Sequence, residues 1–180
     1  MRIYTVAPEV EVNGQSMLAF INNVQQHDIQ PLLEAHNLTE VDADVWYPLQ
    51  NWLDVLNDLN KRSNTTFNFV AVGLGIAKYT FLPPEVEKMP FADVMANING
   101  IYQGNHRGGY SGEIQYEKVN DTHIIFTLID CVYPDDLEYG VAYGFAKRLL
   151  PLGKPFEVTY DENVERLDRG GDLTVIHVKW

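Results

Sequence analysis

The sequence has little of what many catalytic and metal-binding folds depend on. It contains one cysteine, Cys131, so no disulfide can form within the chain and no zinc or iron–sulfur site can be built from several cysteines. The apolar runs are far shorter than the roughly 20 residues of a membrane span. The first residues also lack the apolar stretch of a signal peptide. Together with the low cysteine content, these absences predict a cytoplasmic protein.

Positive charge is also scarce. The chain has 13 Lys and Arg against 25 Asp and Glu, for a net charge of −12. Affinity for nucleic acid comes largely from neutralising phosphates with Lys and Arg, and anionic membranes attract basic segments in the same way. We therefore expect neither nucleic acid nor a membrane surface as a partner.

The histidines form no recognisable metal motif. None of the five pairs with another at i+3 or i+4, and no HExxH run exists: His27, His36, His106, His123 and His177. The last two lie on two predicted strands and could face one another, but a metal there would need at least one further ligand. We predict no metal site.

Nucleophiles and phosphate loops are missing as well. No serine lies in a GxSxG elbow, and Cys131 at the end of an apolar strand is typical of a buried small hydrophobe. The acidic residues 135, 136 and 138 begin a helix, where carboxylates are favoured by the free N–H groups. Gly73-Leu-Gly75 lacks the third glycine of a dinucleotide fingerprint, and no glycine-rich turn carries GK[ST]. We predict no catalytic residues, so an enzyme is not expected.

The composition is that of a globular protein, with 46% hydrophobic and 21% charged residues. The length suits one domain spanning 1–180. Apolar residues at helical spacing predict a helical part over about 1–103, with these segments: Gln15 to Gln26, a short helix starting at Pro31, Pro48 to Arg62 with its end at Ser63 to Thr66, Phe67 to Leu82, and Pro90 to Tyr102. The run from Phe67 to Leu82 also fits a buried strand, but its i+4 spacing and the stop at Pro83-Pro84 favour a helix.

A different pattern fills about 104–180. It predicts two strands, a helix and two more strands, in this order: Tyr110 to Lys118, Thr122 to Cys131, Asp136 to Leu150, Pro155 to Tyr160 and Leu173 to Trp180. Gly140 and Gly144 would let the helix approach a neighbour closely. We therefore predict an α+β fold, an N-terminal helical subdomain followed by ββαββ with a four-stranded antiparallel sheet.

The C-terminal half resembles a known family. The turn Tyr133-Pro-Asp-Asp-Leu-Glu-Tyr-Gly140, the segment Arg169-Gly-Gly-Asp172 and the ending His177-Val-Lys-Trp180 are similar to the 4-vinyl reductase-type domain. That group belongs to the structural superfamily of the haem nitric-oxide-binding (H-NOX) domains and the TRAPP small subunits. The run Asn105-His-Arg-Gly-Gly109 resembles bacterial members attached to signalling proteins.

The resemblance implies a sensor-type scaffold with a pocket between helices and sheet, and not haem. H-NOX domains hold haem with a histidine on the helix before the sheet and a Tyr-x-Ser-x-Arg clamp. Here the segment from Pro90 to Tyr102 contains no histidine, and the clamp region reads Tyr133-Pro-Asp-Asp-Leu137. We therefore expect no cofactor, because both the axial ligand and the propionate cation are missing.

The sequence thus predicts a non-enzymatic sensor-type domain that binds a small, largely apolar molecule. The candidate lining is aromatic and apolar: Phe69, Tyr79, Met95, Tyr102, Tyr133 and Tyr143. Core packing explains the same residues. Two alternatives stay open: an interaction module that forms a homodimer or contacts a signalling protein, and an enzyme or accessory related to tetrapyrrole vinyl reduction.

Overall fold

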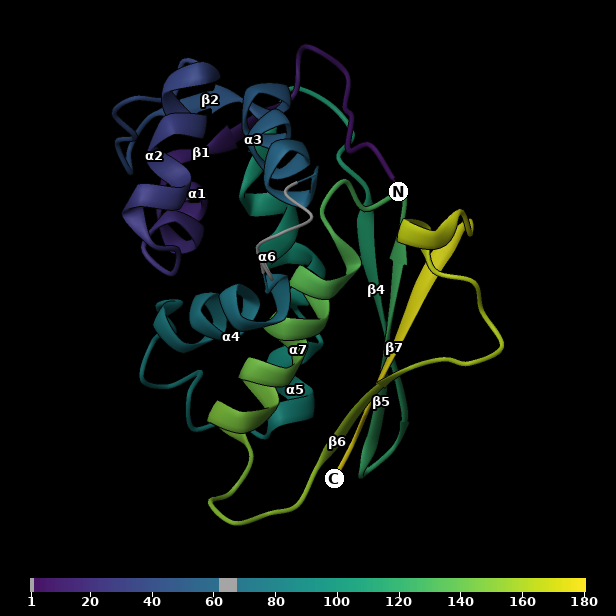
Figure 1. Ribbon diagram of the computed structural model, residues 1–180. Helices are drawn as coiled ribbons and strands as arrows, with labels where there is room; N and C mark the ends of the chain where they lie inside the picture. Colours follow the sequence, from purple (N-terminus) through teal and green to yellow (C-terminus); the bar gives the residue numbers. More distant parts are fainter. Residues whose placement is uncertain (1, 62–67) are drawn as a thin grey trace.

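A four-stranded antiparallel sheet organises the C-terminal half of the computed structural model, which describes residues 2–61 and 68–180 (Figure 1). The strand order is β4-β5-β7-β6, with helix α7 between the second and third strands along the chain. The bounds are β4 (Glu113–Asn120), β5 (His123–Ile129), α7 (Asp135–Leu149), β6 (Glu157–Tyr160) and β7 (Leu173–Lys179). This confirms the predicted α+β fold and its ββαββ unit.

Helices dominate the N-terminal half. Their bounds are α1 (Gly14–Ile21), α2 (Gln26–Ala35), α3 (Leu49–Lys61), α4 (Phe69–Tyr79), α5 (Phe91–Met95) and α6 (Ile98–Gly104). A second, small antiparallel sheet joins β1 (Glu11–Asn13), β2 (Trp46–Pro48) and β3 (His106–Arg107) in the order β2-β1-β3. A short 3-10 helix, η1 (Leu167–Arg169), precedes the last strand. No helix of the described residues is long and apolar enough to cross a membrane.

Three helix predictions need correction. The first helix ends at Ile21, because the Asn23 side chain donates to the Ala19 carbonyl (2.7 Å) in place of a further backbone N–H. Pro31 lies inside α2 rather than in its first turn. The segment from Pro90 forms two helices that part before Asn97, whose side chain donates to the Asp93 carbonyl. The predicted helix end at 63–66 lies outside the described residues.

Helices α4 and α7 cross in close contact at glycines. A Cβ on Gly140 would collide with the Val70 carbonyl, and one on Gly73 would collide with the Leu137 carbonyl. A Cβ on Gly144 would lie 2.6 Å from that of Ala77. The close approach predicted from Gly140 and Gly144 is therefore confirmed, and it fixes α7 between α4 and the sheet.

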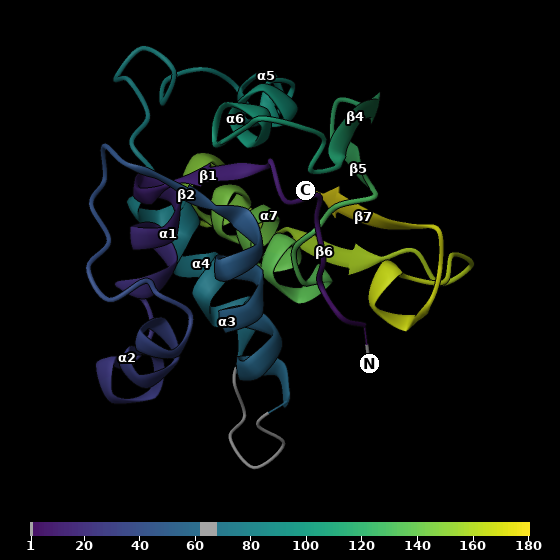
Figure 2. The same ribbon diagram turned by 90° about the horizontal axis from the view of Figure 1, so that it is seen from above.

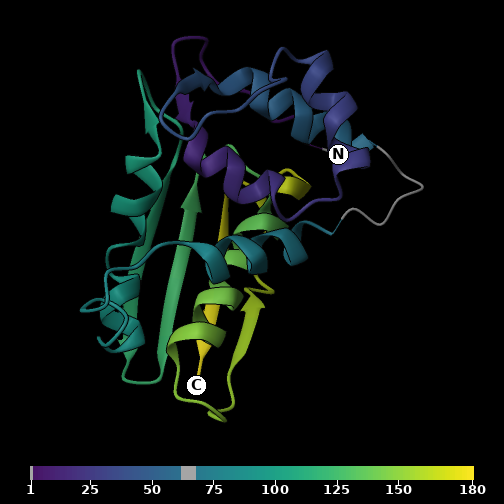
Figure 3. The same cartoon turned by 90° about the vertical axis from the view of Figure 1, so that its left-hand side faces the viewer.

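The sheet has one covered face and one open face. Ile124, Phe126 and Leu128 on β5 are buried beneath α7, whereas the alternate residues of the same strand are half-exposed. Figures 1 and 2 show the α-helices gathered on a single side of the sheet, and Figure 3 looks at the molecule from that side. The covered side holds the core and the candidate pocket.

Candidate ligand-binding pocket

A cavity of about 480 Å³ lies between the helical half and α7. This volume is within the range of small-molecule sites, roughly 300–1,000 Å³. Much of its wall is apolar and comes from four helices, with Phe20 from α1, Ile76 from α4, Ile98 and Ile101 from α6, and Val141 and Phe145 from α7. Such a wall favours a flat or bulky apolar molecule.

His106 lines this cavity from the residue after the α6 C-cap, at the start of β3. Its Nδ1 lies 2.8 Å from the Tyr102 carbonyl oxygen, which can only accept a hydrogen bond, so Nδ1 carries the proton. Burial lowers the pKa of the ring and keeps it neutral. The Nε2 atom therefore carries no proton and has a lone pair that can accept a hydrogen bond, and this is also the form in which histidine binds a metal.

The lone pair on His106 Nε2 accepts a hydrogen bond from the Tyr133 hydroxyl. It donates to His106 Nε2 over 2.7 Å, and burial raises its pKa well above the usual value, so the hydroxyl keeps its proton. Tyr102 stands edge-on to Tyr133, with ring centroids 6.1 Å apart, and donates to the Ser111 carbonyl (2.6 Å). The histidine is thus fixed from both sides by hydrogen bonds that define its tautomer.

Glu138 of α7 supplies an acid to the same cavity. No hydrogen-bond or ion-pair partner for its carboxyl exists among residues 2–61 and 68–180. Burial, followed by the charge of Asp135, raises the pKa of Glu138 to about 7. Near neutral pH the group therefore exchanges between a carboxylic acid, which donates a hydrogen bond, and a carboxylate.

The structure places the six candidate lining residues in different surroundings. Tyr102, Tyr133 and Tyr79 line the cavity, and Tyr79 is 67% exposed. Met95 instead lines a small adjacent void of about 20 Å³ between α7 and the sheet.

Phe69 and Tyr143 do not line the cavity. Phe69 packs near Phe20, with centroids 6.3 Å apart, and Tyr143 packs against Phe156 at 4.9 Å. A role in binding stays a prediction for all six candidates.

Sequence reasoning missed His106 and Glu138. The search for a histidine stopped at Tyr102, but α6 runs to Gly104 and His106 follows its C-cap. A signal was available, since His106 lies in the run that carried part of the family resemblance. Glu138 was interpreted as a helix-start carboxylate, whereas it faces the cavity from the first turn of α7.

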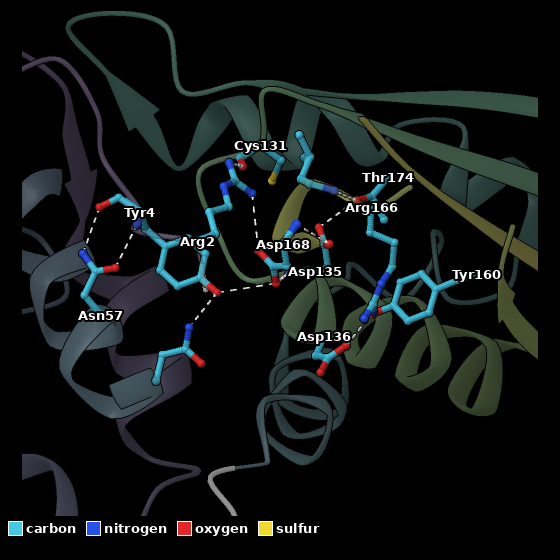
Figure 4. Close-up of polar contacts among 12 residues, drawn as sticks. Arg2, Tyr4, Asn57, Cys131, Asp135, Asp136, Tyr160, Arg166, Asp168 and Thr174 are labelled. Atoms are coloured by element: carbon cyan, nitrogen blue, oxygen red, sulfur yellow. Dashed lines mark hydrogen bonds and ion pairs between the residues drawn. The ribbon is translucent and has the colours of Figure 1, made fainter. Parts of the chain in front are cut away.

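A polar network anchors the start of α7 next to this cavity (Figure 4). Asp135 accepts from the Thr174 hydroxyl (2.8 Å) and from the backbone N–H of Asp168 (2.9 Å), while Asp168 accepts from the backbone N–H of Asp135 (2.8 Å). Arg2 of the N-terminal arm lies 3.5 Å from Asp168 and donates to the Cys131 carbonyl. The arm, η1 and α7 are therefore linked to one another.

The N-terminal arm is also fixed to α3. The Tyr4 backbone and the Asn57 side chain exchange two hydrogen bonds of 2.8 and 2.9 Å. The Tyr4 hydroxyl reaches Asp168 over 3.4 Å. This arm therefore bridges the helical half and the sheet half beside the cavity.

No family model matches the sequence, and no curated protein matches it. Solved structures do match. One, described as a crystal structure of an H-NOX protein from S. oneidensis in the Fe(II)NO ligation state, has a TM-score of 0.67 and 14% identity, covering 93% of this chain and 98% of that one. A second, from work probing the function of heme distortion in the H-NOX family, has a TM-score of 0.68 at 11% identity, covering 93% and 92%.

The chain has the H-NOX fold. A third structure, from work on haem redox potential and porphyrin distortion, has a TM-score of 0.66 and 13% identity, covering 93% of this chain and 97% of that one. The expected resemblance is therefore confirmed at the level of fold. The expectation of no cofactor is wrong by these comparisons, because the structures that share the H-NOX fold include haem proteins. That expectation depended on two absences, a histidine between Pro90 and Tyr102 and a cation for the propionates. His106 lies four residues beyond that segment, whereas no Lys or Arg lines the cavity among the described residues.

Proposed function

We propose that the chain is a sensor-type domain that binds haem in the cavity, with His106 as the axial ligand. The observation that carries this proposal is the hydrogen bonding of His106, a cavity-lining residue whose Nδ1 donates to a carbonyl, so that Nε2 keeps a lone pair, which accepts from the Tyr133 hydroxyl. A histidine that ligates a metal usually donates its other ring N–H to a carbonyl or carboxylate, which orients the ring. Tyr102 provides that carbonyl.

The cavity fits the macrocycle better than it fits the two propionates. Its apolar walls suit a porphyrin, but no Lys or Arg lines it among the described residues. Two cations contact residues that line it: Lys78 lies over the Tyr79 ring, and Arg148 donates to the carbonyls of Thr80 (2.7 Å) and Ala77 (2.9 Å). Arg148 also pairs with Glu87, so it would have to leave that carboxylate to receive a propionate that emerges beside Thr80, which lines the cavity.

When bound, haem held by His106 would supply an iron that can bind a small gaseous ligand. The chain's own residues would set the environment of that iron. Tyr133 would release Nε2 and turn its hydroxyl elsewhere in the cavity, and the apolar wall from α1 and α7 would exclude water.

A sensor must also pass the state of its pocket to another part of the molecule. Glu138 and Asp135 lie three residues apart on α7, and Asp135 is fixed to Asp168 and Thr174. A ligand that shifts α7 would therefore disturb η1 and the N-terminal arm. A signalling protein that reads this change is part of the proposal.

Haem reconstitution tests the function directly. Apo protein is titrated with ferric haem and followed by its Soret absorption. We expect 1:1 binding in the wild type and loss of most of the affinity in His106→Ala, with partial recovery when free imidazole is added. Imidazole recovery separates loss of a ligand from loss of fold.

His36→Ala is the matched control, because this histidine pairs with Asp58 (2.8 Å), which lies on α3, and does not line the cavity. Its haem affinity should equal that of the wild type. A wild type without a Soret band, or a His106→Ala variant with unchanged spectrum and affinity, would sink the proposal.

A further inference from the structure

His123 and His177 contact one another on the open face of the sheet, the face that α7 does not cover. In the β5–β7 register His123 pairs with Lys179 and Ile125 pairs with His177. The two histidines are therefore diagonal neighbours, and their side chains share one face. Their rings lie 5.2 Å apart between centroids, and His123 Nε2 is 2.9 Å from His177 Nδ1.

Asp161, the residue after β6, contacts His177 on the side of the ring away from His123. Its Oδ2 lies 3.0 Å from His177 Nε2. A carboxylate only accepts hydrogen bonds, so His177 carries its proton on Nε2 and leaves the Nδ1 lone pair toward His123. The backbone N–H of Asn163 and the contact with His177 lower the pKa of Asp161, which keeps it ionised.

In the present arrangement the Nε2–H of His123 donates to the Nδ1 of His177. Moving that proton to Nδ1 of the same ring leaves two lone pairs facing one another, with no net gain or loss of protons.

The spacing of these two nitrogens matches a pair of metal ligands. Zinc–imidazole bonds of about 2.0–2.1 Å separate two nitrogens by roughly 2.9 Å at a right angle, and by about 3.4 Å at a tetrahedral angle. The observed 2.9 Å, set here by the hydrogen bond between the rings, equals the first separation, so a metal requires the two rings to turn until both lone pairs point at the ion. The side chains remain reachable from solvent, with 17% of His177 and 24% of Asp161 exposed.

We propose that His123 Nε2 and His177 Nδ1 bind a divalent transition-metal ion, with Asp161 as the carboxylate that orients His177. The described residues contain no group of three or more His, Cys, Asp and Glu arranged around one point. Water therefore completes the coordination shell, and the ion is one that accepts imidazole, such as Zn²⁺, Ni²⁺ or Cu²⁺. The site is independent of haem, because it lies on the opposite side of the sheet from α7.

Calorimetric titration of protein freed of any histidine tag tests the site, with ZnCl₂ and NiCl₂ as the probes. We expect one ion per chain. His123→Ala and His177→Ala should each lower the affinity at least tenfold. Asp161→Asn should lower it about 10–100-fold, as expected for a residue that orients a ligand. A ¹⁵N spectrum of the imidazoles should show His177 Nδ1, and not Nε2, shifted by Zn²⁺.

Two matched variants locate the effect. His27→Ala changes a histidine whose side chain is 73% exposed and should bind metal as the wild type does. His106→Ala should also leave metal affinity unchanged. Wild-type affinity in either sheet variant, or a loss of affinity in His106→Ala, would overturn the proposal. Circular dichroism of each variant shows that a loss of binding is not a loss of fold.

Discussion

The two faces of the β4-β5-β7-β6 sheet differ in how far their polar side chains are exposed to solvent. On the face beneath α7, the polar side chain of Thr174 is fully buried and bonded to Asp135. On the open face, His123, His177 and Asp161 form a chain of hydrogen bonds that stays partly accessible. Burial requires every polar group to be paired or neutral, whereas partial exposure allows a group to exchange one partner for another.

The same contrast separates the two proposed metal-binding histidine sites. His106 is buried and its N–H faces a neutral carbonyl, which suits a ligand that is enclosed with its cofactor. The Nε2 of His177 contacts the Asp161 carboxylate, which orients the ring, and the partly exposed pair suits an ion arriving from solvent. The two sites thus differ in the partner of the ring nitrogen that does not bind the metal, a neutral carbonyl for His106 and a carboxylate for His177.

Removing apolar volume from each face should give the largest difference. Phe126→Ala empties a buried position beneath α7 and should cost about 3–5 kcal/mol of unfolding free energy. Ile125→Ala, its neighbour on the open face, should cost about 1 kcal/mol. Urea denaturation measures both. Equal costs would mean that another chain covers the open face in solution, and the comparison would fail.

Adding volume at the helix crossing should cost less. Gly140→Ala places a methyl group against the Val70 carbonyl and should destabilise by about 1–3 kcal/mol. Gly100→Ala is the matched control, because a Cβ at Gly100 meets nothing within 4 Å. Thermal denaturation compares them. A Gly140→Ala variant as stable as the control would show that α4 and α7 are not in close contact.

The buried acids should make stability depend on pH in a definite direction. The folded pKa is raised for Glu138, to about 7, and for Asp168, to about 6, each mainly by burial and then by Asp135. These two carboxyls therefore bind more protons in the native state than in the unfolded state, and the stability that they contribute falls as pH rises from about 4.5 to above 7. Glu138→Gln should flatten this slope and stabilise at pH 8 by on the order of 1–3 kcal/mol.

The exposed Glu162→Gln serves as the control for that series. It should keep the wild-type slope in urea denaturation at pH 5, 6.5 and 8. A Glu138→Gln variant with the same slope as the wild type would show that the carboxyl is solvated in the cavity.

The sequence supported the fold better than the site, for physical reasons. Apolar periodicity is local, so α3, α4, α7 and the four strands could be predicted from neighbouring residues. The contact between His106 and Tyr133 joins residues far apart in the chain, and its meaning depends on the Tyr102 carbonyl, which no side-chain pattern records. His123 and His177 could be expected to face one another from their strands, but Asp161 reaches His177 from the residue after β6.

The smallest expected effect concerns the competition for His106. In Tyr133→Phe the buried Nε2 loses its donor, so the apo protein should lose about 1 kcal/mol of stability. Haem would no longer have to displace a hydroxyl, so its affinity should rise about fivefold. Tyr143→Phe, which changes a hydroxyl away from the cavity, should alter neither value. Weaker haem binding in Tyr133→Phe would mean that the hydroxyl contacts the bound cofactor rather than competing with it.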